Sequence, residues 1–71
     1  MAIDMIAVSS SNIRSIGWDE ASSTLHVLFA SNLRYAYSGV PENVFKAFLL
    51  APSKGRFFAS HIRDRYPARR V

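Results

Sequence analysis

The chain has 71 residues, no cysteine and a net charge of +4. This length predicts a single domain, residues 1–71 with a core at about 8–66, and leaves little room for a deep catalytic cleft. The lack of cysteine excludes disulfides and thiolate zinc sites, and we expect a cytoplasmic protein. No apolar stretch approaches the roughly 20 residues that span a bilayer, so no membrane partner is expected.

Basic residues gather in the last third of the chain. Residues 51–71 contain six bases and one acid, whereas residues 1–50 contain three bases and four acids. This asymmetry favours a polyanionic partner, and a solvated basic face is the alternative. The candidate phosphate contacts are Lys54, Arg56, Arg63, Arg65, Arg69 and Arg70.

Three segments of the first half have the composition of β-strands. They are Ile13–Asp19, Thr24–Phe29 and Leu33–Tyr37, and the second is the richest in β-branched and aromatic residues. Ile3–Val8 is a candidate for a further strand at the edge of the sheet.

The hairpin between the last two of these strands has two candidate registers. A two-residue loop would pair Ala30 with Leu33 and divide the apolar side chains between both faces. A three-residue loop, 30–32, pairs Phe29 with Leu33 and places Asn32 where the left-handed conformation is needed. We favour the second register, because it collects one apolar face: Leu25, Val27, Phe29, Leu33, Tyr35 and Tyr37.

The second half predicts two helices. Pro41 suits the first position of a helix that ends near Ala51, before Pro52. Ser53 can cap a second helix, which we expect to run to about Tyr66. Residues 68–71 are expected to form a frayed tail. The fold class is therefore α+β, with a small three-stranded antiparallel sheet and two C-terminal helices packed on one face.

An ordered set of residues along most of the chain resembles the KTSC domain family. The set comprises Ser9-Ser10, Ile13, Ile16-Gly17-Trp18-Asp19, Leu25, Val27, Phe29, Tyr35-Ala36-Tyr37, Gly39-Val40-Pro41, Ala51, Ser53, Gly55, Phe57-Phe58, Ile62-Arg63 and Tyr66. Two positions depart from the family pattern, because Trp18 stands where tyrosine is expected and Asn32 where glycine is common. The resemblance implies a short domain of bacterial and phage proteins that also ends some lysyl-tRNA synthetases. RNA binding is suggested from that context.

Two tyrosines, two histidines and a run of serines are further candidates for site residues. Tyr35 and Tyr37 are candidates for stacking on nucleobases, but the favoured register has them packing beneath the helices instead. His26 and His61 are candidates for a metal or acid–base site, but no third ligand is spaced to help, so no metal and no cofactor are expected. The serines of 9–11 lack a neighbouring base, so we expect a turn and not an enzyme.

Arginine spacing supports a phosphate-binding face. Arg56 and Arg63 lie seven residues apart and are expected to share a helix face, while 52–56 places two bases at a helix start. The leading prediction is a nucleic-acid-binding module, with RNA as the first partner class. The alternative is a protein-interaction module that uses an edge strand or an exposed sheet face containing Leu28 and Ala36.

Overall fold

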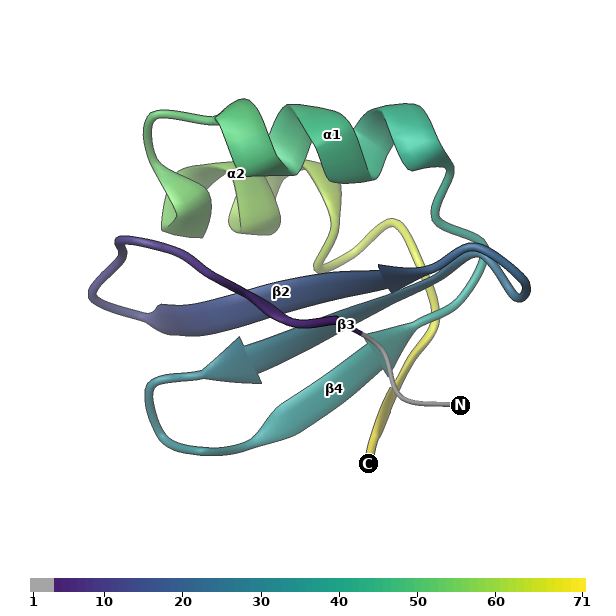
Figure 1. The fold of residues 1–71 in the computed structure, drawn as a ribbon, viewed down its shortest axis with the longest axis horizontal. Coiled ribbons are helices and arrows are strands. Elements are labelled where there is room, and N and C mark those ends of the chain that lie inside the picture. The colour runs from purple at the N-terminus through teal and green to yellow at the C-terminus, as the bar shows by residue number, and fades with distance from the viewer. Residues whose placement is uncertain (1–3) are drawn as a thin grey trace.

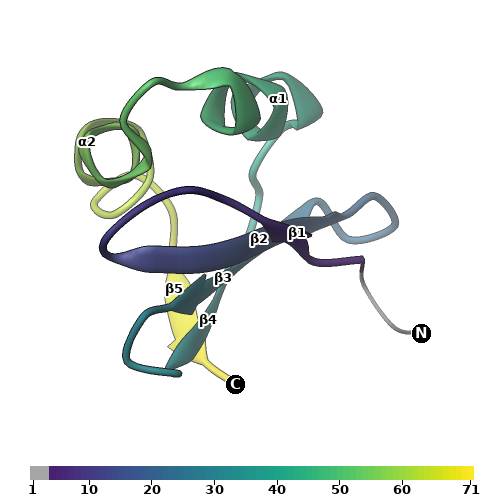
Figure 2. The same ribbon diagram turned by 60° about the vertical axis from the view of Figure 1, so that its left-hand side comes forward.

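The computed structural model describes residues 4–71. Its elements are β1 (Ile6–Ala7), β2 (Ile13–Asp19), β3 (Thr24–Phe29), β4 (Arg34–Tyr37), α1 (Glu42–Leu50), α2 (Lys54–His61) and β5 (Ala68–Arg70). Five strands form one antiparallel sheet in the order β1-β2-β3-β4-β5. Both helices cover the same face of this sheet (Figures 1 and 2), which confirms the α+β class.

The β3–β4 hairpin adopts the register of the three-residue loop. Leu25 pairs with Tyr37 and Val27 with Tyr35, and the Phe29 N–H donates to the Leu33 carbonyl at 2.9 Å. Asn32 closes the loop in the left-handed conformation with φ of 69°. An asparagine is among the few residues other than glycine that tolerate this conformation.

The sheet has two strands more than the three predicted. Strand β1 falls within the candidate segment 3–8, of which residue 3 lies outside the described residues. Strand β5 occupies the segment predicted to be a frayed tail, so that prediction is wrong. The Ser38 N–H donates to the Pro67 carbonyl and the Val71 N–H to the Arg34 carbonyl, each close to 3 Å. The tail is ordered because it pairs with backbone groups of β4 that would otherwise form an open edge.

Helix α2 is shorter than the sequence predicts. It begins after Ser53, whose side chain accepts a hydrogen bond from the Arg56 N–H, but it ends at His61 and not near Tyr66. Ile62 leaves helical geometry with φ of −123°, and its side chain is fully buried. Burial of Ile62 beneath the helices redirects the chain towards β5.

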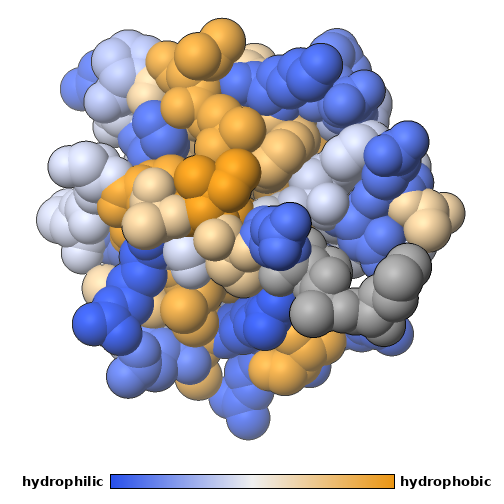
Figure 3. Space-filling view, viewed as in Figure 1, coloured by the Kyte–Doolittle hydropathy of each residue, from blue (hydrophilic) through white to orange (hydrophobic). Residues whose placement is uncertain are grey.

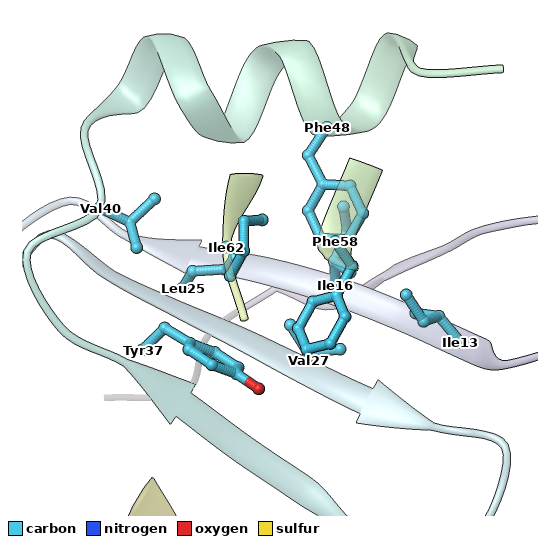
Figure 4. Close-up of a cluster of buried hydrophobic side chains, with 9 residues drawn as sticks. All are labelled: Ile13, Ile16, Leu25, Val27, Tyr37, Val40, Phe48, Phe58 and Ile62. Carbon is cyan, nitrogen blue, oxygen red and sulfur yellow. The ribbon is translucent and has the colours of Figure 1, made fainter. Parts of the chain in front are cut away.

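The core lies between the helices and the sheet. Phe48 of α1, Phe58 of α2 and Ile62 meet side chains that rise from the strands (Figure 4). The strand residues of this cluster are Ile13, Ile16, Leu25, Val27 and Tyr37. Because they come from β2, β3 and β4, the three central strands and both helices share one core.

Part of the apolar surface stays outside the core. In the space-filling view, apolar groups form a band from the helix layer towards the middle of this face, with hydrophilic surface beside it (Figure 3). Leu50, at the end of α1, is 84% exposed. No helix within residues 4–71 has the length and apolar character needed to cross a membrane.

Candidate nucleic-acid interface

The six basic side chains of residues 54–70 do not form one row. Lys54 and Arg56 lie on α2, Arg63 and Arg65 on the turn that follows it, and Arg69 and Arg70 on β5. Arg56 and Arg63 do not share a helix face, contrary to the prediction, because α2 ends between them.

One of the two basic residues at the start of α2, Lys54, makes a hydrogen bond within the protein. The Lys54 ammonium donates to the Ala51 carbonyl at the end of α1, where a cation also suits the helix dipole. Lys54 is half-buried in this position, whereas Arg56 is exposed. Arg56 is therefore the base of this turn whose side chain is open to solvent.

An aromatic stack runs from the core to the surface of the helix layer. Phe57 lies against the buried Phe48 with ring centres 5.3 Å apart and planes 13° apart. His61 lies on Phe57 at 4.4 Å and 18°, and its Nδ1 is 3.3 Å from the Phe57 carbonyl oxygen. Since His61 is exposed, the stack ends in an imidazole open to solvent.

A hollow opens on each side of this stack. One, of about 290 Å³, lies at the start of α2 and includes Ser53 and Arg56 in its wall. The other, of about 390 Å³, lies between α1 and the turn after α2 and includes Arg65 and Tyr66. Phe57 and His61 line both hollows. Two neighbouring hollows therefore share an aromatic wall, and each has one arginine.

Arg63 stands apart from the hollows. Its Nε is 3.8 Å from the Asp64 carboxylate, and both side chains are largely exposed, so this ion pair adds little to stability. Arg63 also lies near Tyr37. Burial and then Tyr35 raise the pKa of Tyr37, and the Arg63 charge opposes this rise in part.

Strand β5 directs its two arginines to opposite faces of the sheet. Arg69 pairs with Ala36, and Arg70 pairs with Tyr35 on the core side. Both are exposed. The two side chains therefore cannot contact the same short stretch of ligand across one face.

The two tyrosines belong to the core side of the sheet. Tyr37 is 4% exposed, and its ring meets Phe58 edge-on at 5.5 Å. Tyr35 is half-buried and meets Phe29 in the same way at 5.7 Å. Their rings already pack against side chains, as the favoured register implies, which leaves Tyr37 no open face for a base.

The remaining candidates lie far from one another in the fold. His26 is on the sheet face away from the helices, whereas His61 is on α2. Within residues 4–71, no three His, Cys, Asp or Glu side chains gather as metal ligands would. The Ser10 hydroxyl accepts a hydrogen bond from the Asn12 N–H at 3.3 Å, which is a turn contact leading into β2.

Sequence reasoning missed the Phe57–His61 stack. The two residues are four apart on a helix, which is the spacing at which neighbouring side chains meet. This spacing is the signal in the sequence, whereas the prediction treats His61 only as a metal ligand or an acid–base group.

The profile of the KTSC domain family matches residues 9–66. The chain therefore belongs to the KTSC domain family, as the ordered set of residues indicated.

Similar proteins agree with this assignment. The crystal structure of a KTSC domain protein from Yersinia pestis superimposes with a TM-score of 0.95 at 40% identity, over 99% of each chain. An uncharacterized protein of Stutzerimonas stutzeri is 43% identical over 75% of each chain. A protein of Tsukamurella paurometabola is 38% identical over 90% of this chain and 96% of its own length.

Proposed function

We propose that this KTSC domain binds single-stranded RNA across the two hollows of the helix layer. The observation that carries the proposal is the Phe57–His61 stack, which ends in the exposed His61 and has one hollow and one arginine on each side. Single-stranded bases bind proteins by stacking on aromatic rings, His included, while arginines contact the phosphates. A strand that crosses the stack would seat its bases in the hollows and its phosphates near Arg56 and Arg65.

The protein-interaction alternative receives less support from the fold. Both residues named for its exposed sheet face are covered, because Ala36 is 1% exposed and Leu28 is half-buried, contrary to the prediction that they are exposed. The open edge at β5 has only three residues and carries Arg69 and Arg70. Short, charged edge strands discourage the addition of another strand.

Fluorescence anisotropy with a labelled single-stranded RNA tests the proposal. Each phosphate contact contributes about −0.7 to the slope of log affinity against log salt for a single strand. The double variant Arg56→Gln/Arg65→Gln should therefore flatten the slope by about 1.4, from these two contacts.

The stacking contact has its own variants and control. His61→Ala should weaken binding by about 1–3 kcal/mol, as the loss of one base stack does, whereas His61→Phe should retain it. Lys46→Gln removes an exposed base of α1 that lines neither hollow, and should leave affinity nearly unchanged. Equal losses for Lys46→Gln and Arg65→Gln would contradict a defined interface.

A further inference from the structure

The sheet face opposite the helices carries a second cluster of basic side chains. Gly17, His26, Ala36 and Arg69 form one cross-strand row from β2 to β5. Directly paired residues share a face, and Leu25 and Val27 on either side of His26 point into the core. The row therefore lies on the outer face, which the helices leave open (Figure 2).

Three basic side chains surround Ala36 on this face. His26 is opposite it on β3 and Arg69 is opposite it on β5. Arg34 precedes it by two residues on β4, and so points to the same side. Neighbouring strands are about 4.8 Å apart, so His26 and Arg69 stand about 10 Å apart with a methyl group between them.

The polar atoms of this cluster are not satisfied by the protein. His26 Nδ1 and Arg34 Nε are buried and have no hydrogen-bond partner among the described residues. Buried polar atoms normally have hydrogen-bond partners, so two unpaired polar atoms on one face of the sheet need an explanation. Ala36 is only 1% exposed although its own side chain is minimal, because the surrounding side chains cover it.

The charges on this face are also coupled. Burial and then the Arg34 charge lower the pKa of His26, and Arg69 acts in the same direction, whereas Asp19 on β2 opposes them. Asp19 is the one acid among the residues that influence this imidazole. The two guanidinium groups thus disfavour the protonated imidazole, and a bound anion would oppose that effect.

We propose that His26, Arg34 and Arg69 form a binding site for a phosphate monoester. Two guanidinium groups match the two charges of a phosphate dianion and can each donate in a forked geometry. The imidazole becomes protonated on binding and donates the remaining hydrogen bond. The side chains that cover Arg34 Nε and His26 Nδ1 shift on binding, so that the anion can supply acceptors to these two groups. This site lies on the other side of the sheet from the RNA hollows, and does not rest on the proposed function.

Nuclear magnetic resonance of the His26 imidazole tests the site with inorganic phosphate as the probe. Saturating phosphate should raise the pKa of His26 by about one unit relative to chloride at equal ionic strength, since an opposite charge at this range favours the protonated ring. An unchanged pKa would overturn the proposal.

Strand β5 provides a matched pair of variants. Arg69→Gln should weaken phosphate binding at least fivefold, whereas Arg70→Gln, with the same charge on the opposite face, should change it less than twofold. Arg69→Lys keeps the positive charge but loses the forked guanidinium geometry, so its phosphate affinity should lie between those of the two glutamine variants. Equal losses for Arg69→Gln and Arg70→Gln would show diffuse attraction to the strand, and would overturn the site.

Two further probes distinguish the source of the phosphate. Adenosine 5′-monophosphate and a 5′-phosphorylated hexanucleotide should each be compared with the same compound lacking the phosphate. Displacement of inorganic phosphate by the mononucleotide alone assigns the site to small phosphate esters, and displacement by both assigns it to nucleic-acid ends as well. Displacement by either unphosphorylated compound would contradict recognition of the monoester. Binding in the hollows is read separately, through His61→Ala.

Discussion

Trp18 joins the sheet to the helix layer through one side chain. Its indole Nε1–H donates to the Val40 carbonyl at 2.8 Å, and its ring lies on Phe45 of α1 with ring centres 6.0 Å apart. Val40 is fully buried, so its carbonyl depends on partners within the protein. The residue at position 18 thus fixes the loop that leads into α1.

Replacing Trp18 with Phe should destabilise the protein by about 1–3 kcal/mol, because the Val40 carbonyl loses its donor while much of the ring packing remains. Urea denaturation followed by circular dichroism measures the free energy of unfolding. Trp18→Tyr is the informative companion, because its hydroxyl can supply a donor again. Equal stability of Trp18→Phe and the parent protein would show that the hydrogen bond contributes nothing.

Two glycines should respond to alanine in opposite ways. Gly55 lies in α2, where an added Cβ would meet the flexible end of Asn12 at an ordinary 3.4 Å. Gly55→Ala should therefore stabilise the protein by about 0.5–1 kcal/mol, through helix propensity. Gly39 has φ of 75° and free space around it, so Gly39→Ala should destabilise by about 1–2 kcal/mol through backbone strain alone. The same sign for both substitutions, in thermal denaturation, would contradict this account.

At the scale of elements, strand β5 is the part of the fold that depends most on distant residues. It has three exposed residues and, within residues 4–71, pairs with β4 alone. Its sequence, Ala-Arg-Arg, has no strand propensity or alternation of its own. Its order comes from the unpaired edge of β4 and from the turn that Pro67 ends.

Ending the chain after Pro67 should expose the β4 edge without removing any core side chain. We expect a loss of about 1–2 kcal/mol from the missing backbone hydrogen bonds, each of which contributes about 0.5–1.5 kcal/mol before the entropy of ordering is subtracted. Hydrogen exchange should speed up at β4 amides while β2 amides remain protected. Unchanged protection throughout β4 would mean that β5 pairs only weakly.

The sequence correctly predicted those elements whose signals lie within a short segment of the chain. Asn32 and the apolar alternation of 25–37 specify the hairpin register, and Pro41 and Ser53 mark where helices begin. The predicted end of α2 was wrong, because burial of Ile62, a tertiary effect, stops the helix before Pro67 does. Pairing of β5 likewise depends on a strand whose residues lie 31 to 35 positions earlier, for which its own sequence has no signal.

At the scale of the whole molecule, the candidate sites divide along the two sides of the sheet. The sequence predicts that basic residues gather in residues 54–70. It does not predict that these residues separate in the fold, with one arginine at each hollow, Arg63 apart from both, and Arg69 and Arg70 on opposite faces of β5. That division follows from where α2 ends and how β5 is registered. The favoured hairpin register already places His26 and Arg34 on one face of the sheet, and the structure confirms this. Arg69 could not be added from the sequence, because the segment that forms β5 was predicted to be a frayed tail.

The outer cluster should make stability depend on pH. Burial and then the Arg34 charge, with Arg69 adding to them against Asp19, lower the pKa of His26 from its ordinary 6.5. The unfolded chain therefore binds more protons at this residue than the folded protein does, and the free energy of unfolding rises with pH across that interval. The contribution of neutral His26 is complete above the ordinary pKa, and is lost as the pH falls through the lowered one.

Urea denaturation between about pH 5.5 and pH 7.5, where histidine titrates, should show this loss in the parent protein and less of it in His26→Gln. We expect a difference of a few tenths of a kcal/mol, because solvent screens a partly exposed imidazole. His61→Gln is the matched control, since it removes the other histidine from the helix layer. If His26→Gln and His61→Gln flattened the pH dependence equally, the electrostatic coupling on the outer face would not be the cause.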